Sequence, residues 1–114
     1  MSVVIYHNPR CSKSRQTLAL IEEKGIMPTI IEYLNSPPSE TELESILIQL
    51  AVEPDALMRK GEDEYKDHIK GKTLSRAQTI RLMVQHPKVI ERPIVVSNNK
   101  AIIGRPPESV LNIL

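Results

Sequence analysis

The order of elements at the start of the chain is the feature that most constrains its fold. Residues 3–6 form a short β-branched run that predicts a buried strand, and Asn8-Pro9 ends that strand. Residues 12–24 carry apolar side chains at helical spacing, and Gly25 stands where a helix C-terminal cap belongs. Residues 29–33 predict a second strand. A strand, a helix and a strand in this order predict a parallel pair joined by a right-handed crossover.

The middle of the chain, at about residues 39–86, predicts a helical insertion. Two capping-box pairs mark helix starts there: Ser39 with Glu42, and Ser75 with Gln78. An apolar stripe at helical spacing follows the first pair, and an apolar segment follows the second. A further short helix is expected between them, opened by a proline and reaching Leu57 and Met58.

The C-terminal part predicts a β-hairpin and a closing helix. Apolar residues 94–96 and 101–103 flank Asn98-Asn99, and asparagine tolerates the positive φ of a tight turn. Residues 108–114 then carry a helical apolar face. We therefore predict one α/β domain spanning 1–114, with a central mixed four-stranded sheet built from a β-α-β unit and a hairpin.

Composition and charge exclude several classes of partner. The chain has three Tyr but no Phe or Trp, so the aromatic surfaces on which single-stranded nucleic acids stack are nearly absent. The net charge of +1 gives no strong attraction to DNA or to an anionic membrane. The apolar runs are too short to span a membrane, and the N-terminus lacks the pattern of a signal peptide. We therefore expect a cytoplasmic protein that binds neither nucleic acid nor membrane.

Cys11 is the only cysteine, and it stands where the first strand gives way to the first helix. Unpaired N–H groups and the macrodipole at a helix N-terminus favour a thiolate over a thiol. His7, Arg10, Lys13 and Arg15 place further donors or cations nearby. A lone cysteine is otherwise a small buried hydrophobic residue, but this position favours a reactive thiolate.

The spacing around Cys11 excludes some known thiol sites. A tyrosine-phosphatase loop needs five residues between Cys and Arg, whereas Arg15 follows Cys11 after only three. The segment Cys11-Ser-Lys-Ser14 has the form of a redox Cys-x-x-Cys motif whose second sulfur is replaced, so it can form a mixed disulfide but cannot resolve it internally. The histidines show no metal-ligand spacing, so no metal site is expected: His7, His68 and His86.

Three arginines stand beside turn-forming or apolar residues: Arg59 in "ALMRK", Arg92 in "ERPIVV" and Arg105 in "IGRPP". Each taken alone is most simply a solvated side chain. Guanidinium groups bind tetrahedral oxyanions in a bidentate manner, however, so arginines that converge near a thiolate would indicate an anionic substrate.

The motifs "YHNPRCSKSR", "LMRK", "HPKVIERPIVV" and "IGRPPE" occur in the order found in a known family. From Ile5 to Leu114 the chain resembles the short bacterial glutaredoxin-coupled arsenate reductases, in the arsenate reductase/Spx branch of the thioredoxin-like superfamily. The resemblance implies a thioredoxin-like sheet, with Pro93 as the cis proline that faces the active thiol.

The resemblance also implies a mechanism. Cys11 would attack arsenate, glutathione would attack the adduct as co-substrate, and glutaredoxin would take up the mixed disulfide, with no metal or other bound cofactor. Three residues would bind the oxyanion: Arg59, Arg92 and Arg105. Four would form the loop that activates the thiolate: His7, Asn8, Ser14 and Arg15.

Two other functions stay open. One is an Spx-like regulatory protein that binds RNA polymerase, and the other is a thiol-disulfide exchange protein that acts on glutathionylated partners. The presence of all three arginines favours the enzyme, and the lack of a second cysteine near Cys11 disfavours a Cys-x-x-Cys redox switch.

Overall fold

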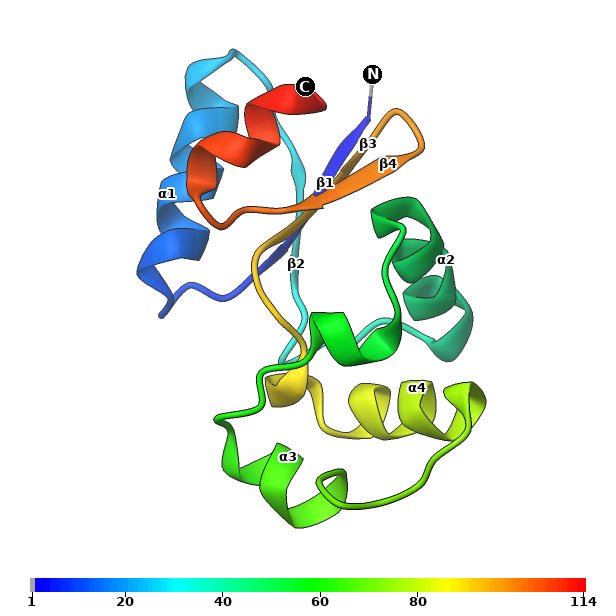
Figure 1. Ribbon diagram of the computed structural model, residues 1–114. Coiled ribbons are helices and arrows are strands. Elements are labelled where there is room, and N and C mark those ends of the chain that lie inside the picture. The colour runs from blue at the N-terminus through cyan, green and yellow to red at the C-terminus, as the bar shows by residue number, and fades with distance from the viewer. Residues whose placement is uncertain (1) are drawn as a thin grey trace. The chain divides into compact units, whose positions relative to one another are not determined.

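The structure contains a four-stranded mixed sheet with the strand order β2-β1-β3-β4 (Figure 1). Strand β1 (Val3–His7) pairs in parallel with β2 (Thr29–Glu32) and antiparallel with β3 (Ile94–Ser97). Strand β4 (Lys100–Ile103) pairs antiparallel with β3. The predicted α/β class and mixed four-stranded sheet are confirmed.

The computed structural model describes residues 2–114, and the chain separates into two units. The first unit contains the chain up to Ser36 and again Arg92–Leu114, and so holds the whole sheet. The second unit is the helical segment Pro37–Glu91. The prediction that both form one domain stays a prediction.

Helix α1 (Ser12–Glu23) packs on the sheet, where its Ile21 joins a buried aliphatic cluster. The cluster consists of residues from the sheet, α1 and the C-terminal segment: Val3, Ile5, Ile21, Val95 and Val110. Gly25 follows α1 with a φ of +77°, a left-handed conformation that glycine adopts without steric cost.

The last helix differs from the prediction. It is a 3-10 helix, η3 (Pro107–Asn112), rather than an α-helix over 108–114. The N–H groups of Ser109 and Ile113 donate to the carbonyls of Pro106 and Val110, three residues back in each case. In the 3-10 form, which has three residues per turn, the two buried residues Pro107 and Val110 lie on the same face of the segment.

The second unit consists of short helices. These are α2 (Glu40–Leu50), the 3-10 helix η1 (Pro54–Leu57), α3 (Asp63–His68), α4 (Arg76–Gln85) and the 3-10 helix η2 (Pro87–Val89). The expected short helix after residue 53 therefore exists, but it ends at Leu57. The next residue, Met58, is extended because it bridges to Ile90.

Both predicted capping boxes are present. Ser39 accepts the N–H of Glu42 at 3.1 Å and its own N–H donates to the Glu42 carboxylate at 2.9 Å. Ser75 and Gln78 make the same reciprocal pair at the start of α4, at 3.2 and 2.9 Å. These bonds satisfy N–H groups that a helix start otherwise leaves unpaired.

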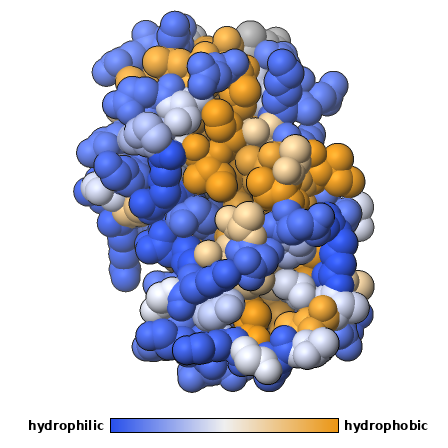
Figure 2. All heavy atoms as spheres, viewed as in Figure 1, coloured by the Kyte–Doolittle hydropathy of each residue, from blue (hydrophilic) through white to orange (hydrophobic). Residues whose placement is uncertain are grey.

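The predicted hairpin turn is also confirmed, with Asn98 and Asn99 at φ values of 55° and 61°. Hydrophilic side chains cover most of the face drawn in Figure 2. None of the helices within residues 2–114 combines the length and the apolar character that a membrane crossing needs.

Candidate active site

Cys11 lies in the first unit, at the residue that caps the N-terminus of α1, with φ −93° and ψ 123°. Its N–H donates to the Asn8 carbonyl at 3.0 Å, and its carbonyl accepts the N–H of Arg15 at 3.0 Å. The chain therefore turns directly from β1 into the helix at the thiol. This is the place that the sequence predicts for it.

A buried hydroxyl holds the loop before Cys11 in shape. The Ser14 Oγ atom accepts the N–H of Asn8 at 3.0 Å and lies 2.6 Å from the His7 Nδ1 atom. Ser14 is fully buried, and His7 and Asn8 are nearly so. Three of the four residues assigned to the activating loop therefore form one hydrogen-bonded group.

The protonation of His7 follows from this environment. Burial lowers its pKa, the Glu32 carboxylate opposes that effect, and Arg15 adds to it, leaving the pKa below the ordinary histidine value. A neutral ring can accept a hydrogen bond at Nδ1 from the Ser14 hydroxyl, while that hydroxyl accepts the N–H of Asn8.

Arg15 and Arg10 form further hydrogen bonds within the same loop. The Arg15 guanidinium donates to the Pro9 carbonyl at 2.9 Å. The backbone N–H of Arg10 donates to the Asn8 side-chain oxygen at 3.0 Å. The Arg15 side chain therefore holds the loop in shape. The hydrogen bond found for it goes to the backbone of Pro9 and not to the thiol of Cys11.

Two of the three predicted arginines act at the sulfur. The Arg105 Nη2 atom lies 3.5 Å from Cys11 Sγ, and its Nε donates to the Arg92 carbonyl at 2.8 Å. The Arg92 guanidinium also acts on the thiol, whose pKa it lowers. Both arginines precede a cis peptide bond, Arg92–Pro93 and Arg105–Pro106.

These donors change the acidity of the thiol. Burial would raise the pKa of Cys11, but the N–H of Ser14, the Arg92 guanidinium and the N–H of Lys13 outweigh it, and the pKa is lowered. No N–H group in the first turn of α1 forms a capping hydrogen bond to the Cys11 side chain. Its N–H groups still favour the charged sulfur, because charge stabilisation acts over longer distances than a capping bond.

The sequence patterns did not predict the close approach of Gly104 to Thr17 and Pro93, next to the site. A Cβ atom on Gly104 would lie 2.5 Å from Thr17 Oγ1 and 2.8 Å from Pro93 Cγ, so only glycine fits there. Thr17 is fully buried on α1. The glycine before "RPP" in "IGRPP" was the available signal.

Arg59 lies in the second unit. Its Nη1 atom forms an ion pair with Glu91 Oε1 at 2.8 Å, and its N–H donates to the Val89 carbonyl. The carboxylate partner was not predicted. A role for Arg59 together with Cys11 stays a prediction from the family resemblance.

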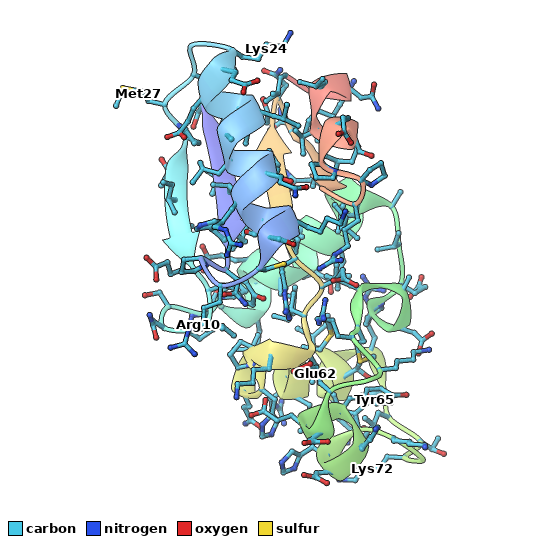
Figure 3. All side chains as sticks on the ribbon, turned by 90° about the vertical axis from the view of Figure 1, so that its left-hand side faces the viewer. Arg10, Lys24, Met27, Glu62, Tyr65 and Lys72 are labelled. Carbon is cyan, nitrogen blue, oxygen red and sulfur yellow. The ribbon has the colours of Figure 1, made fainter. Side chains whose placement is uncertain are left out.

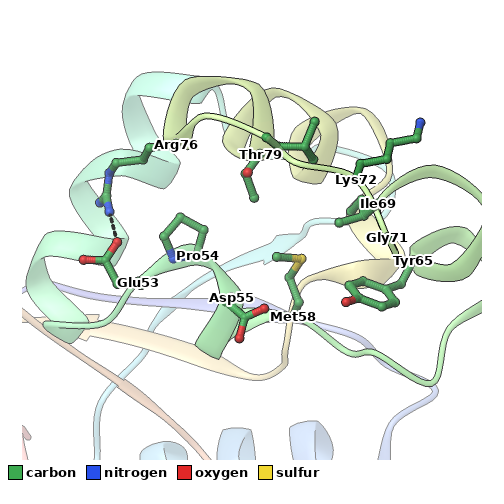
Figure 4. Close-up of a pocket in the computed structure, with 11 residues that line it drawn as sticks. Glu53, Pro54, Asp55, Met58, Tyr65, Ile69, Gly71, Lys72, Arg76 and Thr79 are labelled. Carbon is green, nitrogen blue, oxygen red and sulfur yellow. Dashed lines mark hydrogen bonds and ion pairs between the residues drawn. The ribbon is translucent and has the colours of Figure 1, made fainter.

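The second unit also contains a cavity of about 340 Å³ (Figure 4). Three of its four charged side chains pair with neighbours: Arg76 binds Glu53 at 2.7 Å, and Asp55 binds Lys60 at 2.8 Å. Nothing in this cavity matches the reactivity of a thiolate. Over residues 2–114, no cluster of three or more His, Cys, Asp or Glu side chains could hold a metal ion.

The fold and the position of the cysteine together define a class, that of thioredoxin-like α/β proteins with a single cysteine at the start of the first helix. The chain belongs to the ArsC family, whose model matches residues 6–113. It is 50% identical to a protein of Haemophilus influenzae named arsenate reductase, with 100% of both chains covered.

Two further comparisons agree. The chain is 40% identical to an arsenate reductase of Neisseria meningitidis, over 98% of this chain and 97% of that protein. A solved structure described as an arsenate reductase from Vibrio cholerae is 54% identical, with a TM-score of 0.95 and coverage of 100% of this chain and 98% of that one.

Proposed function

We propose that this protein is an arsenate reductase that uses glutathione and glutaredoxin as reductants. The observation that carries the proposal is the thiol of Cys11, held at a helix N-terminus with a lowered pKa and with Arg105 at 3.5 Å from its sulfur. The names of the ArsC relatives supply the choice of arsenate among oxyanions.

In the first step, the thiolate of Cys11 attacks arsenic. A sulfur–arsenic bond forms, an arsenic–oxygen bond breaks, and the leaving oxygen departs as water after taking up protons. The guanidinium groups of Arg92 and Arg105 bind the anionic oxygens of arsenate and offset their charge while the bond forms. The neighbouring Ser14 and His7 keep the loop in the shape that presents the sulfur.

In the second step, the thiolate of glutathione attacks the sulfur of Cys11. A disulfide bond forms, the sulfur–arsenic bond breaks, and its electron pair stays on arsenic, which is reduced from As(V) to As(III). The two sulfurs are oxidised together to the mixed disulfide. Because Cys11 is the only cysteine, a glutaredoxin thiol must then displace it from the disulfide.

Three further parts of the proposal come from the resemblance. Arg59 would be a third ligand of the oxyanion, the reaction would need no metal or other bound cofactor, and a glutathione-coupled reaction would belong in the cytoplasm. The alternatives, an Spx-like regulator and a general thiol-disulfide exchange protein, would both keep Cys11 but would not turn over arsenate.

The test is arsenate-dependent NADPH oxidation in the presence of glutathione, glutaredoxin and glutathione reductase. We expect turnover by the wild type and none above background by Cys11→Ser. Lys24→Glu, an exposed change at the far end of α1 from the thiol, is the matched control and should retain turnover. A folded wild type that does not oxidise NADPH when arsenate is added would contradict the proposal.

A further inference from the structure

A cavity of about 380 Å³ lies in the first unit beside the loop that carries Cys11. The nearly buried His7 and Asn8 line its inner part. Arg10 and Glu32, both exposed, bring one positive and one negative charge to it. A volume of this size lies within the range of sites for small molecules.

We propose that this cavity binds the glutathione that reacts at Cys11, an inference that rests on the proposed function. Glutathione is a small peptide with one ammonium group and two carboxylates. Arg10 can bind a carboxylate and Glu32 the ammonium, so the pair matches the zwitterionic end of the peptide.

The charges of this pair are available to a ligand. Among residues 2–114, no hydrogen bond or ion pair is found for the Arg10 guanidinium or the Glu32 carboxylate, and Glu32 acts only electrostatically on the ring of His7. This distinguishes them from Arg76 and Glu53 of the second unit's cavity, which already bind each other. Leu34 and Asn35 add an apolar wall and an amide that suit the peptide backbone.

The position relative to the thiol also suits the second step of the reaction. Arg10 directly precedes Cys11, and Asn8, which lines the cavity, accepts the N–H of Cys11 at 3.0 Å. The oxyanion-binding Arg92 and Arg105 do not line the cavity. The two reactants would therefore occupy different groups of residues, and glutathione would extend its sulfur towards Cys11 from the cavity.

The inference is tested by a reaction that needs no arsenate. The thiolate of Cys11 attacks oxidised glutathione, forming the protein–glutathione disulfide and releasing one glutathione thiolate. Its rate is divided by the rate with 2-hydroxyethyl disulfide, which is neutral, so that changes in the reactivity of the sulfur cancel. We expect Arg10→Glu and Glu32→Lys each to lower this ratio by at least about fivefold, because each places a like charge against the ligand.

The two variants separate a binding site from long-range attraction. Oxidised glutathione is an anion, so a simple field effect would make Glu32→Lys faster, whereas the site predicts that it is slower. Lys24→Glu, which carries the same charge change as Arg10→Glu, is the control. Figure 3 shows Lys24 and Arg10 at opposite ends of α1. The control ratio should stay within about twofold of the wild type, because exposed charges that far apart are largely screened by salt.

An unchanged ratio for either variant, or a higher ratio for Glu32→Lys, would overturn the inference. If a charge-reversal variant fails to fold, Arg10→Ala or Glu32→Gln is measured in its place. The outcome is independent of arsenate turnover. Loss of turnover with an intact preference for glutathione would refute the proposed function alone, and turnover without that preference would refute the cavity alone.

Discussion

Cys11 occupies a helix position where serine, threonine, aspartate and asparagine are preferred. Two helices of the second unit follow that preference, with Ser39 before α2 and Ser75 before α4. The start of α1 instead presents its N–H groups to a sulfur, and its first turn has no acidic side chain. This helix start therefore favours a negative charge on the thiol.

This arrangement predicts a pH-dependent contribution of Cys11 to stability. Its pKa is lower in the folded than in the unfolded state, so the unfolded state binds more protons between the two values. Stability contributed by the thiolate is therefore complete above the unfolded pKa of about 8.5 and is lost as the pH falls through the folded pKa. Urea unfolding from pH 6 to pH 9 should show the free energy of the wild type rising relative to that of Cys11→Ser.

A parallel course of the two stability curves would show that the folded protein does not favour the thiolate. The alkylation of Cys11 by iodoacetamide gives an independent reading, because its rate follows the thiolate fraction. Its midpoint should fall below the ordinary pKa of cysteine.

Helix α1, the end of β4 and the cis Arg92–Pro93 bond meet at Gly104, next to the site. Gly104 follows β4, and its N–H donates to the Pro93 carbonyl at 2.9 Å. Its Cα lies against Thr17 of α1, with no room for a side chain. The chain leaves the sheet after Ile103, and the Nη2 atom of Arg105 then lies 3.5 Å from Cys11 Sγ.

Gly104→Ala should therefore destabilise the protein by about 1–3 kcal/mol, because the new methyl group overpacks the junction. Thr17→Ala removes two of the three crowding atoms, so the double variant should lose less stability than the sum of the single changes. Urea unfolding gives the free energy of unfolding of the wild type, the two single variants and the double variant. Gly61→Ala is the control, because no atom lies within 4 Å of a Cβ added there. Strict additivity would contradict the proposed contact.

Local patterns predicted most of the fold and half of the site. The β-α-β opening, the Asn98-Asn99 turn and the capping boxes depend on residues close in sequence, where spacing alone is informative. The contact of Gly104 with Thr17 and the ion pair of Arg59 with Glu91 join residues far apart in sequence. No periodicity indicates such pairs, and a 3-10 rather than an α-helical end also depends on packing.

At the scale of the whole protein, the proposed reaction requires one thiol to take part in a transfer of two electrons. A disulfide needs two sulfurs, so every turnover must bring a second thiol to Cys11. The first unit holds the thiolate, two arginines and the cavity assigned to glutathione, while Arg59 belongs to the second unit. The account therefore requires that Cys11 carry glutathione after each reduction of arsenate.

The most direct test omits glutaredoxin, so that the reaction stops at the mixed disulfide. The protein is incubated with arsenate and glutathione, and arsenite and the glutathione bound to Cys11 are measured together, the latter by intact and peptide mass spectrometry. We predict equal amounts of arsenite and of mixed disulfide on Cys11, and neither product when arsenate is omitted or in Cys11→Ser. Arsenite formed without the disulfide on Cys11 would contradict the account.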